Sequence, residues 1–203
     1  MYRSLSLLLL AISLHGCAVF PQGGTPPTTL APSSLAADAK PNLAYSSTAL
    51  GGLGQANRLP PEAQSVIEGE LVGVLQQSGY FGRLSKQDAE ADIKLDVTMT
   101  NTGSGAAIIP AIITGLSFYT IPSWATDHFR IDANVTRRDG VSRQYQVSDS
   151  TVLVQWLPMI FVFPFSNFSE VPSTRQNMYR KLLADMQRDG MLEPTAAPAQ
   201  AAR

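Results

Sequence analysis

The chain has 203 residues, of which 44% are hydrophobic and 15% are charged, and its formal net charge is −1. The apolar fraction suffices for the core of a single domain, and the balanced charge excludes the basic surface that nucleic-acid-binding proteins carry. The single cysteine, Cys17, excludes an intrachain disulfide.

The first residues have the pattern of a secretory signal. They read MYRSLSLLLLAISLHGCAVF, with Arg3 as the only charge ahead of a mainly apolar run from Leu5 to Leu14. Ten residues span only ~15 Å as a helix, about half of a bilayer core. We therefore expect residues 1–16 to be a signal peptide and not a transmembrane anchor.

The sequence Leu14-His15-Gly16-Cys17 resembles the bacterial lipobox, although His15 departs from the small residues that are commonest at its position. The resemblance implies that Cys17 receives a diacylglyceryl group on its thiol, becomes the first residue after cleavage and is acylated on its amine. Because Ala18 follows and not aspartate, it further implies sorting to the outer membrane, facing the periplasm. The alternative is an ordinary buried cysteine behind a plain signal peptide.

Residues 18–42 are rich in Pro, Gly, Ser, Thr and Ala and show no periodicity. We therefore expect residues 17–42 to comprise the lipidated Cys17 and a flexible tether. Residues 193–203 have a similar composition and are expected to form a disordered tail. One periplasmic domain is expected between these segments, over residues 43–192.

Periodicity predicts a strand, a helix and two further strands in the first part of this domain. Residues 43–50 are expected to form the first strand, and residues 61–79 a helix that begins at a proline, ends at a glycine and carries one apolar stripe. Residues 92–100 and 129–135 alternate between apolar and polar side chains, which is typical of strands with one wet face.

A third alternating strand begins near Tyr145, after a turn signal at 138–140, and is expected to form a hairpin with residues 129–135. A last helix is predicted from Ser173, as its cap, to about Arg188. This element order predicts an α+β fold. We expect a two-layer sandwich with a mostly antiparallel sheet of three to five strands, two helices on one face and two apolar inserts.

The stretch LVGVLQQSGYFGRLSKQDAEADIKLDV resembles periplasmic lipoproteins and secretion accessories in which a helix ends in Gly-Tyr-Phe and an Ala-Asp pair precedes a strand. The matching residues are Gly79, Tyr80, Phe81, Ala91 and Asp92. The chain is also similar to uncharacterised outer-membrane lipoproteins with a Gly/Pro-interrupted apolar segment between strands. These resemblances imply a compartment and a fold class, but no activity.

Two apolar inserts separate the predicted strands. GAAIIPAIITGLSFYTIPSW covers residues 105–124 and TVLVQWLPMIFVFPF covers residues 151–165, both within longer stretches that lack charge. Four interpretations are open: a pair of transmembrane helices, buried core, a lobe that enters the membrane interface, and an interface with another subunit or protein. Prolines in both inserts argue against spanning helices. We expect both inserts to leave one edge of the sheet as a single lobe, with candidate contacts at Tyr119, Trp124, Trp156, Phe161 and Phe163.

Residues for catalysis or metal binding are scarce. His128 beside Asp127 allows a formal Ser-His-Asp arrangement with Ser117, but the sequence TGLSFY around Ser117 is not a nucleophile elbow. Once the signal is removed, His128 is the only histidine, so neither a zinc site nor another cofactor is expected. We therefore expect no enzymatic activity.

These patterns predict an outer-membrane-anchored periplasmic lipoprotein with a non-enzymatic scaffold or assembly role in the cell envelope. Its expected partners are the membrane, through a lipid anchor on Cys17, and either further copies of the chain or another envelope protein. No nucleic acid is expected. A carrier or binding module for lipid or another apolar ligand is the alternative, and a serine hydrolase is a remote one.

Overall fold

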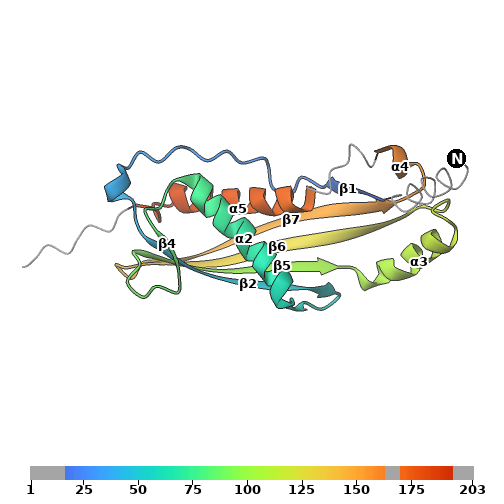
Figure 1. The fold of residues 1–203 in the computed structure, drawn as a ribbon, viewed down its shortest axis with the longest axis horizontal. Coiled ribbons are helices and arrows are strands. Elements are labelled where there is room, and N and C mark those ends of the chain that lie inside the picture. Colours follow the sequence, from blue (N-terminus) through green and yellow to red (C-terminus); the bar gives the residue numbers. More distant parts are fainter. Residues whose placement is uncertain (1–16, 163–169, 194–203) are drawn as a thin grey trace, which may run out of the picture.

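The computed structural model describes residues 17–162 and 170–193, so the predicted signal peptide and most of the predicted tail lie outside the described residues. Figure 1 shows an elongated domain whose long strands run along its length. The elements in chain order are β1 (Cys17–Pro21), a 3-10 turn η1 (Ala37–Ala39), β2 (Leu43–Leu53), β3 (Asn57–Arg58), α2 (Pro61–Ser78), β4 (Leu84–Lys86), β5 (Ile93–Gly103), a 3-10 turn η2 (Gly105–Ala107), α3 (Ile108–Leu116), β6 (Ser123–Arg137), β7 (Ser142–Gln155), α4 (Met159–Val162) and α5 (Glu170–Arg188).

The strands form one seven-stranded sheet in the order β1-β7-β6-β5-β2-β3, with β4 also paired to β2. The α+β class is confirmed, but the expected three to five strands is wrong, because β1, β3 and β4 are too short to show a periodic pattern. Neighbours β5, β6, β7 and β1 are antiparallel, whereas β2 is parallel to β5 and to β4. The parallel pair arises because α2 lies between β2 and β5 in the chain and returns it to the same end of the sheet.

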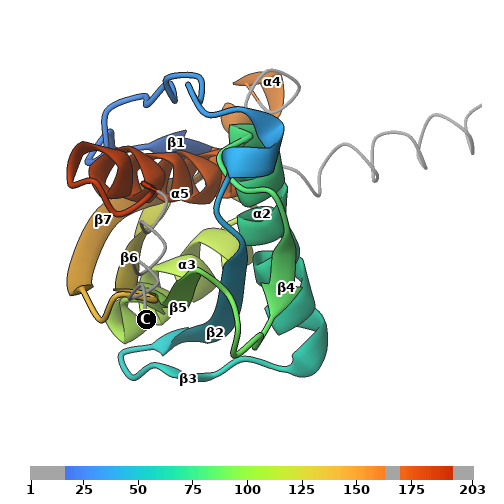
Figure 2. The same ribbon diagram turned by 90° about the vertical axis from the view of Figure 1, so that its left-hand side faces the viewer.

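The core lies between one face of the sheet and the helices α2 and α5, which Figure 2 shows on the same side of the sheet. On β5 the side chains alternate as predicted: Leu95 and Val97 are buried, whereas Lys94 and Asp96 are exposed on the opposite, open face. The buried side chains of β6 continue this row, since Val97 pairs with Ala133 across the ladder. The two-layer arrangement with two helices on one face is therefore as expected.

Several element boundaries differ from those predicted. The ladder between β6 and β7 runs on to the pair Ser123–Gln155, so β7 includes the first five residues of the second insert. The helix α5 begins at Glu170, and Ser173 donates its hydroxyl to the Glu170 carbonyl from within the first turn, so Ser173 is not the cap. The predicted end of α2 is confirmed, since Gly79 takes the left-handed conformation with φ 65°.

Residues 22–42 form a strap that runs along α5 from β1 to η1, drawn in blue in Figure 1. The carboxylate of Asp149 accepts hydrogen bonds from the backbone N–H groups of Gly24 and Thr25, both at 3.0 Å. Further along, the Tyr80 hydroxyl donates to the Ala31 carbonyl at 2.6 Å.

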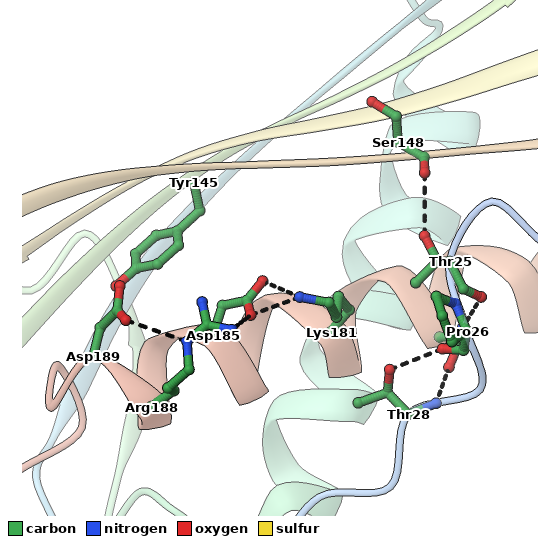
Figure 3. Close-up of polar contacts among 10 residues, drawn as sticks. Thr25, Pro26, Thr28, Tyr145, Ser148, Lys181, Asp185, Arg188 and Asp189 are labelled. Atoms are coloured by element: carbon green, nitrogen blue, oxygen red, sulfur yellow. Dashed lines mark hydrogen bonds and ion pairs between the residues drawn. The ribbon is translucent and has the colours of Figure 1, made fainter.

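The side chain of Asn177 on α5 is the third group that binds the strap. Its Oδ1 accepts from the Thr28 N–H at 2.8 Å, and its Nδ2 donates to the carbonyls of Thr25 and Pro26, both at 3.1 Å. Figure 3 shows Thr25, Pro26 and Thr28 gathered over this helix. The segment thus differs from the flexible tether expected from its composition, because the folded domain supplies partners for its backbone.

Candidate functional site

Cys17 lies at one end of the sheet. It is the first residue of β1 and pairs with Gln155, the last residue of β7, while Ser123 at the start of β6 pairs with Gln155 from the other side. Burial raises the pKa of the Cys17 thiol, against a smaller opposing effect of the Gln155 side chain. The one cysteine and residues of both apolar inserts therefore lie together at one end of the molecule (Figure 1).

The first insert forms η2 and α3, which project beyond this end of the sheet (Figure 1). Only Thr114 of α3 is buried. Its apolar side chains are exposed, with fractions of 47% for Ile108, 68% for Ile109, 55% for Ile112, 46% for Ile113 and 78% for Leu116. For these side chains the interpretation of the insert as buried core is wrong.

The turn after α3 holds an unusual backbone. Phe118 and Tyr119 have φ values of 52° and 61°, in the left-handed region that non-glycine residues rarely adopt. The turn is held by the Tyr119 N–H, which donates to the Thr114 carbonyl at 2.8 Å. As a result, Phe118 is 82% exposed at the tip of the insert.

The second insert continues β7, and its later residues turn toward the first insert. The Leu157 N–H donates to the Tyr119 carbonyl at 2.7 Å, so a backbone hydrogen bond joins the two inserts. This contact places the described parts of the two inserts side by side. Trp156 is 39% exposed and Phe161 on α4 is 79% exposed, whereas the candidate Phe163 lies outside the described residues.

The apolar surface extends from the inserts onto the open face of the sheet. Trp124, which is 68% exposed, pairs with Val154, and Val154 pairs with Ala18 of β1. Two residues further along the ladder, Val152 pairs with the exposed Phe20. Side chains two residues apart on a strand share a face, so these positions lie on one face of the sheet, where Trp124 and Phe20 are exposed and Ala18 between them is buried.

We call this whole surface the apolar end. Its exposed apolar residues are Phe20, Ile108, Ile109, Ile112, Ile113, Leu116, Phe118, Ile121, Trp124, Trp156, Leu157 and Phe161. The described segments that build it, residues 17–37, 97–126 and 150–162, contain no Asp, Glu, Lys or Arg. By contrast, ion pairs gather at the opposite end of the domain, among them Arg83–Asp88, Arg138–Asp92 and Arg143–Asp189.

Within the described residues, no hydrogen bond joins the side chains considered for catalysis. The Ser117 hydroxyl donates to the Thr114 carbonyl at 2.9 Å and accepts from the Ile121 N–H at 3.1 Å, so it serves the turn after α3. His128 is exposed on the open face of β6, and burial raises the pKa of its neighbour Asp127. Within residues 17–162 and 170–193, no group of three or more His, Cys, Asp or Glu side chains could hold a metal ion.

The hollow beside α2 lies away from the described parts of both inserts. A hollow of about 1060 Å³ lies between β2 and α2, and its lining includes the polar side chains of Ser46, Thr48, Gln64 and Glu68. Neither insert contributes to that lining. Among the helices that the structure describes, none has the length and apolar character needed to cross a membrane.

The sequence matches no protein-family model and no curated protein. Solved structures with a similar fold include a protein of Xanthomonas campestris, at 12% identity over 81% of this chain and 97% of that one, with a TM-score of 0.40. They also include rare lipoprotein B of Shewanella oneidensis, at 10% identity over 74% of this chain and 96% of that one, with a TM-score of 0.45. A minor lipoprotein of Acinetobacter baumannii is similar at 13% identity over 77% of this chain and 96% of that one, with a TM-score of 0.38. At such low identity these similarities do not assign the chain to a family or an activity.

Proposed function

We propose that this protein is a lipid-anchored component of the bacterial cell envelope, held through Cys17 in the outer membrane and facing the periplasm, with a non-enzymatic scaffold or assembly role. The observation that carries the proposal is the position of Cys17 in the apolar end, in register with Gln155. An anchor that leaves the chain there holds the apolar end at the membrane. The ion pairs of the opposite end then face the aqueous space.

The scaffold role is favoured over an enzymatic one by the distribution of side chains. Ser117 is engaged in its own turn and His128 lies on an open, solvated face. The most unusual surface is instead the apolar end, and exposed apolar surfaces of this extent mark contacts with a membrane or with another protein. A carrier role lacks comparable support, because neither insert contributes to the lining of the hollow between β2 and α2.

The anchor is tested by metabolic labelling of the full chain with a radioactive fatty acid in a lipoprotein-processing bacterium. We expect the wild-type protein to carry the label and to sediment with the outer membrane on a density gradient. The Cys17→Ser variant should carry none, because a thioether requires the sulfur. Label on Cys17→Ser, or a wild-type protein that stays unlabelled, contradicts the proposal.

A further inference from the structure

We infer that the partner of the apolar end is the lipid leaflet that holds the anchor, into which α3 and the tips of both inserts enter. This inference rests on the proposed anchoring at Cys17 and adds what the anchored domain touches and how it is oriented. The strands then stand steeply on the membrane surface, with the apolar end in the leaflet and the hairpin between β6 and β7 farthest from it.

The first argument is that α3 lacks the contacts that would stabilise it in water. Helices as short as its nine residues are marginal on their own, and most helices gain their stability from an apolar face packed against a core. In α3 that face is exposed instead, from Ile108 to Leu116. A helix with this composition is stable when another apolar phase covers it.

The second argument selects lipid as the covering phase. Interfaces between proteins have a polar rim and are enriched in arginine, whereas the segments 17–37, 97–126 and 150–162 lack all charged residues. In addition, β1 pairs with β7 from Cys17 onward, so an anchor on Cys17 leaves no slack between the lipid and the apolar end. This surface therefore lies at the bilayer wherever the anchor is inserted.

The third argument concerns depth. The charge-free part of β6 runs from Ser123 to the first charged residue, Asp127, which is four residues or ~13 Å along the strand. Amphipathic elements at membrane surfaces enter by ~5–10 Å, so the insertion can end before Asp127 and the exposed His128. Trp124 lies in this band and Trp156 lies next to its end, directly after the partner of Ser123, and tryptophan is enriched at the level of the lipid headgroups.

The fourth argument is the strained turn at the tip. Left-handed conformations of non-glycine residues have an energetic cost and occur most often where they serve a function. At Phe118 and Tyr119 the strained backbone directs outward the aromatic side chain that is most exposed among the described residues, and the Tyr119 carbonyl accepts a hydrogen bond from the Leu157 N–H. Phe118 is thus placed as the leading residue of the insertion.

The test uses the mature chain from residue 17 onward with Cys17→Ser, so that no acyl group contributes, and vesicles of neutral phosphatidylcholine with or without anionic phosphatidylglycerol. We expect flotation with both kinds of vesicle, unaffected by salt, and quenching of tryptophan fluorescence by brominated lipid. Phe118→Ser and Phe161→Ser should each weaken partitioning about tenfold, because each removes a largely exposed aromatic side chain from the inserted surface.

Matched controls are Val66→Ser and Val141→Ser, which alter exposed apolar residues outside the apolar end and should leave partitioning unchanged. The inference is overturned if vesicles are not bound, if binding requires anionic lipid and low salt, or if Phe118→Ser instead dissolves an oligomer seen by analytical ultracentrifugation. The Cys17→Ser variant carries no lipid, so the two proposals are tested independently. If the variant does not bind vesicles, the labelling result for Cys17 is unaffected. If the wild-type protein is not labelled, the vesicle assay can still be interpreted.

Discussion

Replacing Asn177 with alanine should release the strap while leaving the core folded. The variant removes three hydrogen bonds, one from the Thr28 N–H and two to the carbonyls of Thr25 and Pro26. At ~0.5–1.5 kcal/mol for each bond, the loss is about 1.5–4.5 kcal/mol of strap binding. The strap lies on the surface, so the loss should appear as local opening and not as global unfolding.

Amide hydrogen exchange read by NMR is the suitable assay, because it resolves single positions in the strap. With ~3 kcal/mol lost, exchange at Thr28 should quicken about a hundredfold, while amides of β5 in the sheet centre keep their protection. Gln176→Ala is the matched control: it alters a half-buried neighbour on α5 that makes no side-chain hydrogen bond within the described residues. Unchanged exchange at Thr28 in Asn177→Ala would refute the reasoning.

Two further predictions concern stability. Arg175 binds Glu70 through two hydrogen bonds of 2.6 and 2.7 Å, with 12% and 11% of the two side chains exposed, so Arg175→Met should cost ~3–5 kcal/mol in urea unfolding by leaving Glu70 alone. The double variant with Glu70→Leu should recover most of this, and a stable single variant contradicts the prediction. Burial and Asp189 raise the pKa of Tyr145 to about 12 from 10.0. The folded state therefore binds the Tyr145 proton more tightly than the unfolded state does, which stabilises the fold. This stabilisation is complete below pH ~10 and is lost as the pH rises toward ~12. In thermal melts, the melting temperature of Tyr145→Phe should therefore fall less steeply with alkaline pH than that of the wild type.

The helix α2 and the strands β5 to β7 could be predicted because their own side chains carry the period of the structure. In β5 the buried residues fall at every second position, and α2 begins at Pro61 and ends before Gly79. The strand β1 could not be predicted, because the sequence CAVFP has no alternation and ends in proline. What makes it a strand is the edge of β7, whose paired residues lie 130 to 138 positions away in the chain.

The sequence predicts only part of the candidate site. The missing charges and the aromatic residues indicated an unusual surface, and the structure places Trp124, Trp156 and Phe161 on it. The sequence could not separate core from surface, because a helix as uniformly apolar as α3 shows no polar face from which its orientation follows. Phe118 was missed as well, since its exposure depends on a backbone conformation that its residue type does not favour.

The paired β1 also changes the energetics of the proposed membrane contact. A flexible tether of 25 residues would let the domain wander ~25–30 Å from its anchor, which dilutes any weak contact between protein and lipid. With Cys17 already paired to Gln155, the anchor and the apolar end share one rigid edge, so insertion becomes intramolecular and proceeds at a high effective concentration. The apolar end then needs only modest affinity of its own. The coupling between the anchor and the insertion of the apolar end depends on the pairing of β1 with β7 and not on the strap. In an anchored protein, Asn177→Ala should therefore loosen the strap without weakening the membrane contact, provided that β1 stays in the sheet.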